Sequence, residues 1–356
     1  MLIPFAIDEK SLSEPAEAYY DASEWGIFHK NLIKFYMTCG ALCYFGDSWS
    51  AEHTENLLSL VPANYRQQWS VIIQKYPRLR PNFNWNGAIP SQSGCMFDTI
   101  EVGLMNSQRA NLDFGFSEES VDIERKITSA DGAEITLIKN AAYNTTMKYE
   151  EFENLAHKKA FVASTNSPTI EDEWQARFKR LICFENSPRF ITIFDRFSFQ
   201  AELKDPTSST HHSTSNFIRR VDRDAHDNKV IKIICSNEVL SDQGRQSNSI
   251  PPKDKEFIIR ELKNLKALCR YGKVSKIELV IIDGRKAQWQ AHDRHIRFGN
   301  LYLWDLGSGT DIFDQLNRRR NVSVSFKTGQ KVIEGYETAE NFFLNSRDLI
   351  IFRTSV

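Results

Sequence analysis

The chain has 356 residues, of which 41% are hydrophobic and 26% are charged, so it is long enough for two folded domains and too apolar to be disordered. Its 45 basic and 46 acidic residues give a formal net charge of −1, which excludes a positive field over the whole molecule. The six cysteines form no CxxC pair, no basic leader opens the chain and no apolar run reaches about 18 residues, so we expect a cytoplasmic protein without a transmembrane segment, metal or cofactor.

The N-terminal part of the chain is rich in helix signals. Apolar residues recur at helical spacing in four stretches, 23–38, 52–60, 64–76 and 149–163. Short strands are predicted over 97–104 and 135–138. We therefore expect a mainly helical α+β domain over residues 1–150, whose role no motif indicates. A linker is expected over 151–168, because its end is a run of turn-forming Ser, Thr, Asn and Pro residues.

From residue 169 onward, predicted strands alternate with predicted helices. Helices are expected over 170–182, 213–224, 252–268 and 337–344. Strands are expected over 189–195, 230–235, 276–282, 296–304 (as one strand or a hairpin), 322–326 and 349–352. This alternation predicts an α/β domain over residues 169–356, in which helices cover both faces of a sheet.

An unusual group of polar residues follows the strand predicted over 276–282. Five residues that bind anions or support such binding fall within six positions: His292, Asp293, Arg294, His295 and Arg297. Alternate residues of a strand share a face, so His292 and Arg294 are expected together on one face. A histidine and an arginine on one face form a suitable site for an anion or a phosphate group. The glycine turn around Ser308 would add backbone N–H groups or a hydroxyl.

Residues 290–313 resemble the C-terminal domain of MIT-domain-containing proteins, which belongs to the phospholipase D-like superfamily. The resemblance is carried by a His-Asp-Arg motif, an aromatic strand, a glycine turn and an Asp-x-Phe motif, here His292-Asp293-Arg294, Leu301–Trp304, Gly307-Ser308-Gly309 and Asp311-Ile312-Phe313. The upstream strand that ends in Asp195-Arg196 fits the same arrangement. The resemblance covers about half of the chain and implies a phospholipase D-like mixed sheet flanked by helices.

The same resemblance implies how an active site would be built. In active members, a histidine attacks a phosphodiester, a lysine two residues later binds the phosphate, an aspartate supports the histidine, and a Gly-Ser turn follows. Here His292 stands at the nucleophile position, Arg294 replaces the lysine, and Gly299 replaces the aspartate. The catalytic set, if the domain is active, is therefore His292, Arg294 and Ser308. Asp195-Arg196 would be the vestige of a second motif.

Three functions are compatible with these residues. The first is a non-enzymatic recognition or adaptor subunit of a larger assembly, for which the resemblance suggests a microbial anti-phage defence system with protein partners. It would bind a phosphate-bearing ligand such as nucleic acid through five residues, Arg294, Arg297, His295, Asp195 and Arg196. The second is a phospholipase D-type phosphodiesterase or nuclease that acts through His292, as a homodimer. The third is a structural dimerisation module, in which these side chains only hold the fold.

Two smaller patterns lie near the end of the helix predicted over 213–224. Arg219, Arg220 and Arg223 form a local basic run, which is typical of a solvated helix end and is also a candidate basic patch. Asp222, Asp224 and His226 have a spacing that suggests a metal site, but a solvated helix end is again the simpler interpretation.

Overall fold

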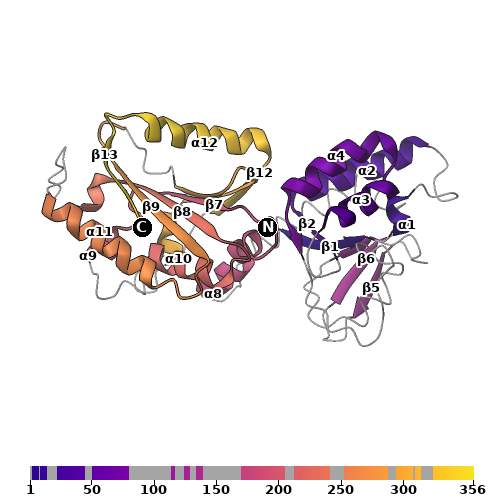
Figure 1. Cartoon of the computed structure of the whole chain (residues 1–356), viewed down its shortest axis with the longest axis horizontal. Coiled ribbons are helices and arrows are strands. Elements are labelled where there is room, and N and C mark those ends of the chain that lie inside the picture. Colours follow the sequence, from indigo (N-terminus) through magenta and orange to yellow (C-terminus); the bar gives the residue numbers. More distant parts are fainter. Residues whose placement is uncertain are drawn as a thin grey trace. The chain divides into compact units, whose positions relative to one another are not determined.

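The computed structural model divides the chain into two compact units (Figure 1). Unit 1 comprises Met1–Lys159 and Phe184–Ser187, and unit 2 comprises Ala160–Cys183 and Pro188–Val356. The division after Lys159 falls within the segment expected to be a linker. The structure describes residues 2–7, 9–13, 22–44, 50–79, 114–116, 124–128, 134–138, 170–204, 212–240, 252–287, 294–307, 309–313 and 324–356.

Unit 1 contains a six-stranded sheet, although the sequence led us to expect a mainly helical domain. The strand order is β3-β2-β1-β4-β6-β5, and every neighbouring pair is parallel except β5 and β6. The strands are β1 (Ile3–Ile7), β2 (Gly40–Cys43), β3 (Arg78–Leu79), β4 (Phe114–Phe116), β5 (Glu124–Thr128) and β6 (Glu134–Ile138). Only β6 lies where a strand was predicted. The strand predicted over 97–104 and the helix predicted over 149–163 lie outside the described residues.

The described helices of unit 1 are α1 (Glu9–Leu12), α2 (Ala22–Thr38), α3 (Ala51–Leu60) and α4 (Ala63–Lys75). The last three match the predicted helices within one residue at each end and gather on one side of β1 and β2 (Figure 1), whereas α1 was not predicted. Apolar residues of β1, α2 and α4 form one core, whose largest buried side chains include Phe5, Phe28 and Trp69. The mainly helical prediction was incomplete because β1 and β2 have only 5 and 4 residues and read as apolar loop ends.

The core of unit 1 also holds a buried histidine. His29 is 0% exposed, its ring stacks on Tyr65 at 5.0 Å, and its Nδ1 accepts a hydrogen bond of 3.1 Å from Trp69 Nε1. Burial lowers the pKa of His29 to about 4, because the charged imidazolium would lose its hydration. His29 is therefore a neutral core residue at pH 7.

Unit 2 is built on a mixed seven-stranded sheet. The strand order is β12-β11-β10-β7-β8-β9-β13, in which β7, β8 and β9 are parallel and the other pairs are antiparallel. The strands are β7 (Phe190–Phe194), β8 (Lys229–Ser236), β9 (Val274–Ile282), β10 (His295–Phe298), β11 (Tyr302–Leu306), β12 (Val324–Thr328) and β13 (Ile350–Ser355). The predicted α/β class is confirmed for this unit, and the segment 296–304 is a hairpin.

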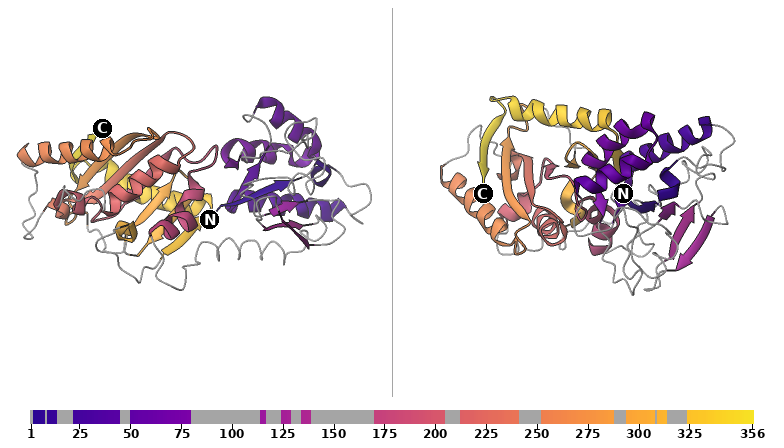
Figure 2. Two further views of the ribbon diagram at one scale, coloured as in Figure 1. Left: turned by 90° about the horizontal axis from the view of Figure 1, so that it is seen from below. Right: turned by 45° about the vertical axis from the view of Figure 1, so that its right-hand side comes forward.

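Helices cover both faces of this sheet. The chain passes from β7 to β8 through α9 (Gln200–Lys204) and α10 (Ser213–Asp224). It passes from β8 to β9 through η4 (Asn237–Leu240) and α11 (Pro252–Ala267). Figures 1 and 2 show α10 and α11 on one face of the sheet and α12 (Gln330–Asn345) on the other. The observed α12 begins seven residues before the helix predicted over 337–344, and Val332, Ile333 and Tyr336 already lie at helical spacing in its first turns.

Aromatic side chains fill the core on the α10 face. The helix predicted over 170–182 is three short elements, α8 (Ile170–Glu173), the π-helical η1 (Trp174–Phe178) and the 3-10 helical η2 (Lys179–Leu181). Phe178 is fully buried, and its ring centroid lies 5.0 Å from that of Phe313 and 5.7 Å from that of Trp304. Phe313 ends the 3-10 helix η5 (Gly309–Phe313), so this cluster fixes η5 beneath the sheet.

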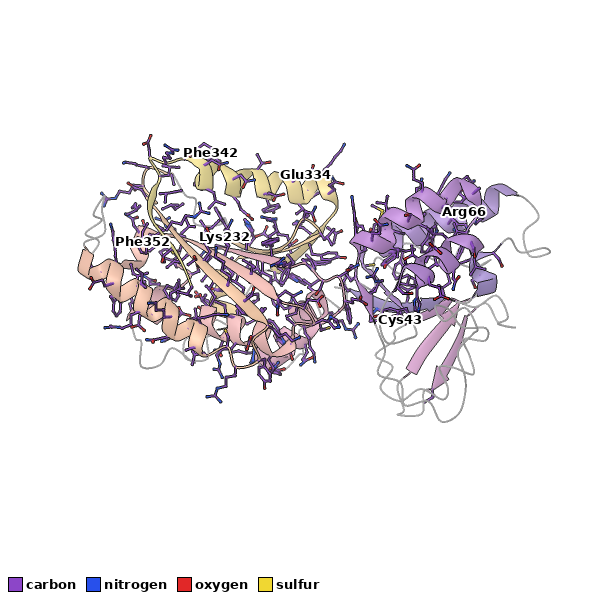
Figure 3. The ribbon with its side chains drawn as sticks, viewed as in Figure 1. Cys43, Arg66, Lys232, Glu334, Phe342 and Phe352 are labelled. Atoms are coloured by element: carbon purple, nitrogen blue, oxygen red, sulfur yellow. The ribbon has the colours of Figure 1, made fainter. Side chains whose placement is uncertain are left out.

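The α12 face has a smaller apolar core. Phe194, Ile234, Val280 and Ile282 lie on three adjacent strands and pack against Phe343 and Leu344 of α12, among others. Figure 3 shows side chains filling the layer between α12 and the strands. The opposite side of α12 carries exposed residues, including Glu334 and Phe342.

Candidate functional site at the carboxyl edge of the parallel strands

Three of the sequence-predicted residues, Asp195, Arg196 and Arg294, lie at one edge of the unit 2 sheet. β7 ends at Phe194, so Asp195 and Arg196 follow directly at the carboxyl edge of the parallel strands. β10 runs antiparallel to β7 and pairs His295 with Phe194, so Arg294 comes to the same edge. In open α/β sheets, the crevice outside the carboxyl ends of the strands is the usual place for a ligand.

Asp195 is the centre of a buried hydrogen-bond network at this edge. It is 3% exposed, and its Oδ2 accepts hydrogen bonds from the backbone N–H of Thr310 (2.8 Å) and from Thr310 Oγ1 (3.2 Å). Its Oδ1 accepts a hydrogen bond of 3.0 Å from the backbone N–H of Phe197 and lies 3.7 Å from Arg294 Nε. Asp195 therefore joins the end of β7 to η5 and to the start of β10.

Gly309 lets η5 approach this carboxylate. Its φ angle is +66°, and a Cβ atom at this position would lie 2.1 Å from Asp195 Oδ2 and 2.9 Å from Arg294 Cδ. Any other residue would meet both a strained backbone and a steric clash. The glycine turn that the sequence marked as a source of backbone N–H groups thus places the N–H of Thr310 on Asp195.

Arg294 is the least satisfied cation at the edge. Its side chain is 13% exposed, its only ion pair within the described part of the chain is the 3.7 Å approach to Asp195, and its buried Nε has no hydrogen-bond acceptor there. Its guanidinium carbon lies 5.3 Å from the centre of the Phe197 ring. Arg294 is therefore less fully bound within the fold than the other cations at this edge.

Arg196 is held more firmly. Its Nε and Nη2 each donate a hydrogen bond of 2.5 Å to the carboxylate of Glu238, which lies in η4. These bonds raise the pKa of Arg196 although partial burial opposes them. Arg196 also lies over the Phe197 ring, at 5.4 Å. A phosphate group would have to displace Glu238 to use this guanidinium fully.

His295 and Arg297 point to the other face of the sheet and bind α12. Arg297 Nε and Nη2 donate hydrogen bonds of 2.8 and 2.6 Å to the two oxygens of Glu340, and His295 Nε2 lies 2.9 Å from Glu340 Oε1. Glu340 is 1% exposed. The His295 ring also stacks on Phe194 at 4.9 Å. We call His295, Arg297 and Glu340 the α12 clamp.

Charge compensation within the α12 clamp is strong. Burial alone would raise the pKa of Glu340, but the hydrogen bonds from Arg297 and His295 hold it below its usual value. Burial likewise lowers the pKa of Arg297, but the bonds with Glu340 raise it overall. The clamp is therefore a buried ion pair that locks α12 to β10, and its donors are already used.

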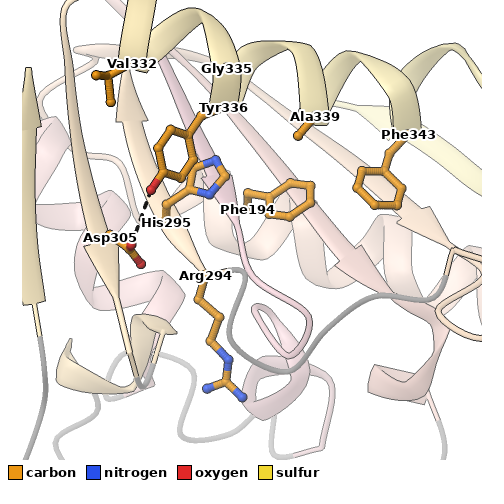
Figure 4. Close-up of a pocket in the computed structure, with 9 residues that line it drawn as sticks. All are labelled: Phe194, Arg294, His295, Asp305, Val332, Gly335, Tyr336, Ala339 and Phe343. Atoms are coloured by element: carbon orange, nitrogen blue, oxygen red, sulfur yellow. Dashed lines mark hydrogen bonds between the residues drawn. The ribbon is translucent and has the colours of Figure 1, made fainter. Parts of the chain in front are cut away.

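A cavity of about 350 Å³ lies between α12 and the strand ends (Figure 4). Its lining is mainly apolar, with Phe194, Tyr336 and Phe343 among its residues. Tyr336 donates a hydrogen bond of 3.3 Å to Asp305 Oδ2. In Figure 4, the Arg294 side chain extends away from Tyr336 and His295, so the cavity and the free guanidinium donors face different directions.

The predicted site residues thus divide into groups. Asp195, Arg196 and Arg294 lie together at the edge, whereas His295 and Arg297 do not, because strand alternation turns them under α12. Gly299 lies in the turn after β10, at the far end of that strand from Arg294. His292, Asp293 and Ser308 lie outside the described residues, so their predicted placement stays a prediction.

Three partners of these residues were not identified from the sequence. Glu340 is 43 positions from Arg297, Glu238 is 42 positions from Arg196, and Thr310 is 115 positions from Asp195. No local sequence motif predicts such pairings. Glu340 lies within the helix predicted over 337–344, but nothing in its local sequence indicates that its carboxylate is buried.

No family model and no curated protein matches this sequence. Across the described ranges, no helix is long and apolar enough to cross a bilayer. The same ranges contain no group of three or more His, Cys, Asp or Glu side chains suited to a metal ion. The site must therefore be interpreted from its own geometry.

Proposed function

We propose that unit 2 is a non-enzymatic recognition domain that binds a phosphate-bearing ligand at the carboxyl edge of β7 and β8, with nucleic acid as the first candidate. The observation that carries this proposal is the guanidinium of Arg294, which lies 3.7 Å from Asp195 and keeps a buried Nε without an acceptor among the described residues. An incoming phosphate group would bind the guanidinium of Arg294, since guanidinium groups bind phosphate in two-point geometry.

The proposed fold family is a degenerate phospholipase D-like domain. The support is the resemblance of residues 290–313, together with the mixed sheet that brings Arg294, Asp195 and Thr310 to one edge. The near-neutral net charge of the chain implies that affinity comes from this local site. We propose that the protein acts as a subunit of a larger assembly, such as an anti-phage system, in which protein partners supply the remaining functions.

The proposed site uses only part of the predicted set. Arg294 binds the phosphate group, Asp195 and Thr310 hold the loop that positions it, and Arg196 serves the fold through Glu238. His295 and Arg297 are removed from the ligand set because Glu340 occupies their donors. The proposed enzyme alternative, with His292 as nucleophile in a homodimer, becomes one outcome of the test.

The test is a binding and cleavage assay with the full chain. Fluorescence anisotropy would measure the affinity for labelled single- and double-stranded DNA and RNA, for the wild type, Arg294→Ala and Arg196→Ala. The two variants lose the same charge at the same edge, so they form a matched pair. We expect Arg294→Ala to weaken binding about tenfold, since one guanidinium–phosphate contact is worth about 1–3 kcal/mol, and Arg196→Ala to weaken it less than about twofold.

The outcomes separate the alternatives. Equal weakening by both variants, or no binding by the wild type, would contradict recognition at Arg294 and leave a structural module. Cleavage of the labelled strands that disappears in His292→Ala would replace the recognition function by the phosphodiesterase. Cleavage that persists in His292→Ala would indicate a contaminating nuclease, so it would not support the phosphodiesterase.

A further inference from the structure

A second cavity of unit 2 lies at the opposite edge of the sheet. Its volume is about 320 Å³, and it lies where α10 ends and where the turn before β9 begins. Its lining includes four arginines and one tyrosine, Arg219, Arg220, Arg223, Arg270 and Tyr271. β8 has 8 residues, which at the usual rise separates the two edges by roughly 26 Å. This cavity is therefore independent of the site at Arg294.

A buried carboxylate fixes the shape of this cavity. Asp222 is 1% exposed, and its two oxygens accept hydrogen bonds from the backbone N–H groups of Tyr271 (2.7 Å) and Val274 (3.0 Å). The interpretation as a solvated helix end is therefore wrong for Asp222, which is buried and holds the loop before β9. Gly272, with a φ angle of +71°, forms the turn between those two donors. Arg270 and Tyr271 are therefore held in place against α10.

The arginines differ in how far acidic residues neutralise them. Arg223 is bound by Asp224 at 2.6 Å and by Glu171 at 3.0 Å. Arg220 shares Glu171, at 3.2 Å, but its buried Nε has no acceptor among the described residues. Burial lowers the pKa of Arg220, and the neighbouring cations Arg223 and Arg219 add to this effect. A further anion beside Arg220 would relieve both penalties.

Arg270 and Tyr271 are exposed, as are Arg219 and Arg223, but they come from the loop before β9 and not from α10. No acidic side chain pairs with Arg270 in the described part of unit 2. Tyr271 is 66% exposed, although its backbone is anchored by Asp222. A large exposed aromatic ring on a fixed loop beside a guanidinium group is the combination that binds a base next to its phosphate.

We propose that this cavity binds a nucleotide unit. The phosphate group contacts the guanidinium groups of Arg270 and Arg220, and the base stacks on the ring of Tyr271. The volume lies at the lower end of the range for small-ligand pockets, which suits one nucleotide. The nucleotide comes either from a single-stranded nucleic acid or from a free mononucleotide, and the two sources share this chemistry.

The experiment measures binding of a labelled 12-residue oligothymidylate and of ADP to the full chain. Arg270→Glu is compared with Arg260→Glu, which makes the same charge change on an exposed residue of α11 outside the cavity lining. Tyr271→Ala is compared with Tyr271→Phe, which keeps the stacking surface. We expect Arg270→Glu and Tyr271→Ala each to weaken binding about tenfold, and both control variants to change it less than about twofold. Circular dichroism melting would check that all variants fold.

The two ligands identify the source of the nucleotide. Tighter binding of the oligothymidylate, with a salt dependence that becomes shallower by about one unit in Arg270→Glu, supports a nucleic-acid strand. Binding of ADP alone supports a free nucleotide. Equal effects of Arg270→Glu and Arg260→Glu, or indifference to Tyr271→Ala, would overturn the proposal. Loss of binding in Arg294→Ala with no loss in Arg270→Glu would overturn it while leaving the proposed function intact.

Discussion

Arg294 and Arg297 are three residues apart, but they lie in opposite environments. Arg297 donates to both oxygens of Glu340 and to the carbonyl of Gly299, so its guanidinium is saturated within the fold. Arg294 approaches one carboxylate at 3.7 Å and keeps a donor without an acceptor in the described part of the chain. The comparison teaches that hydrogen-bond saturation, and not residue type, separates a structural arginine from a candidate binding arginine.

The largest effect that would sharpen this comparison comes from removing the shared carboxylate of the α12 clamp. Glu340→Ala leaves His295 and Arg297 buried without their anion, so we expect the free energy of unfolding of unit 2 to fall by about 3–5 kcal/mol. Urea unfolding measures this change. The matched control is Glu337→Ala, which removes a carboxylate 3.5 Å from Arg297 that is 39% exposed and should cost less than about 1 kcal/mol. Equal losses of unfolding free energy in the two variants would mean that the buried α12 clamp does not stabilise unit 2 more than an exposed ion pair does.

A second effect concerns His29, a buried imidazole that contacts aromatic side chains and should make the stability of unit 1 depend on pH. The pKa of His29 falls from 6.5 to about 4 on folding, so the unfolded chain binds more protons between these values. Stability of unit 1 should therefore be fully present above about pH 6.5 and should decrease as the pH falls toward 4, by up to about 3 kcal/mol. Hydrogen exchange of α2 and α4 at several pH values measures the trend, and His29→Gln should remove it. A trend that survives in His29→Gln would assign it to another group.

A third and smaller effect concerns the glycine beside Asp195. Gly309→Ala introduces a Cβ atom 2.1 Å from Asp195 Oδ2 at a positive φ angle, so we expect a loss of about 1–3 kcal/mol in the free energy of unfolding. The same substitution at Gly335, in an exposed turn of α12 with open space around it, should stabilise the protein by about 0.5–1 kcal/mol. Thermal melts of the two variants that shift in the same direction would contradict the tight packing of η5 on Asp195.

The smallest effect is expected for the ion pair of Arg196 and Glu238. Both side chains are partly exposed, at 23% and 16%, so Arg196→Ala should cost less than about 1 kcal/mol despite the short hydrogen bonds. Denaturant unfolding would measure the cost. A loss as large as that of Glu340→Ala would mean that the ion pair of Arg196 and Glu238 stabilises the fold as strongly as the α12 clamp does.

The sequence predicted the elements whose pattern is local. The bounds of α10 match the prediction of 213–224, because its apolar residues repeat on one face and a polar loop precedes it. The segment 296–304 was predicted as one strand or a hairpin, and the structure shows that it is the hairpin of β10 and β11. Strand alternation predicted that His295 lies on the face opposite Arg294, and the same rule places Arg297 with His295. Both residues were nevertheless included with Arg294 in the predicted ligand set.

The features that could not be predicted from the sequence depend on residues that are far apart in the chain. β1 and β2 pair with each other, and β1 also pairs with β4, which begins more than 70 residues after β2 ends. The arginine cavity was visible only as a basic run, since Arg270 and Tyr271 reach α10 through the carboxylate of Asp222. The residue types indicated the chemistry of both sites, but which residues lie together in each site depends on long-range contacts.

The α12 clamp also has a consequence for biosynthesis. Glu340 follows Arg297 by 43 residues, so at typical translation rates its carboxylate emerges on the order of 2–9 s later. During that interval the nascent chain holds two cationic or polar side chains on β10 with no anion to match them. The β10 strand should therefore dock onto β7 late, and a chain that stops before α12 should fail to close the sheet. The clamp thus makes completion of unit 2 depend on the arrival of its penultimate element.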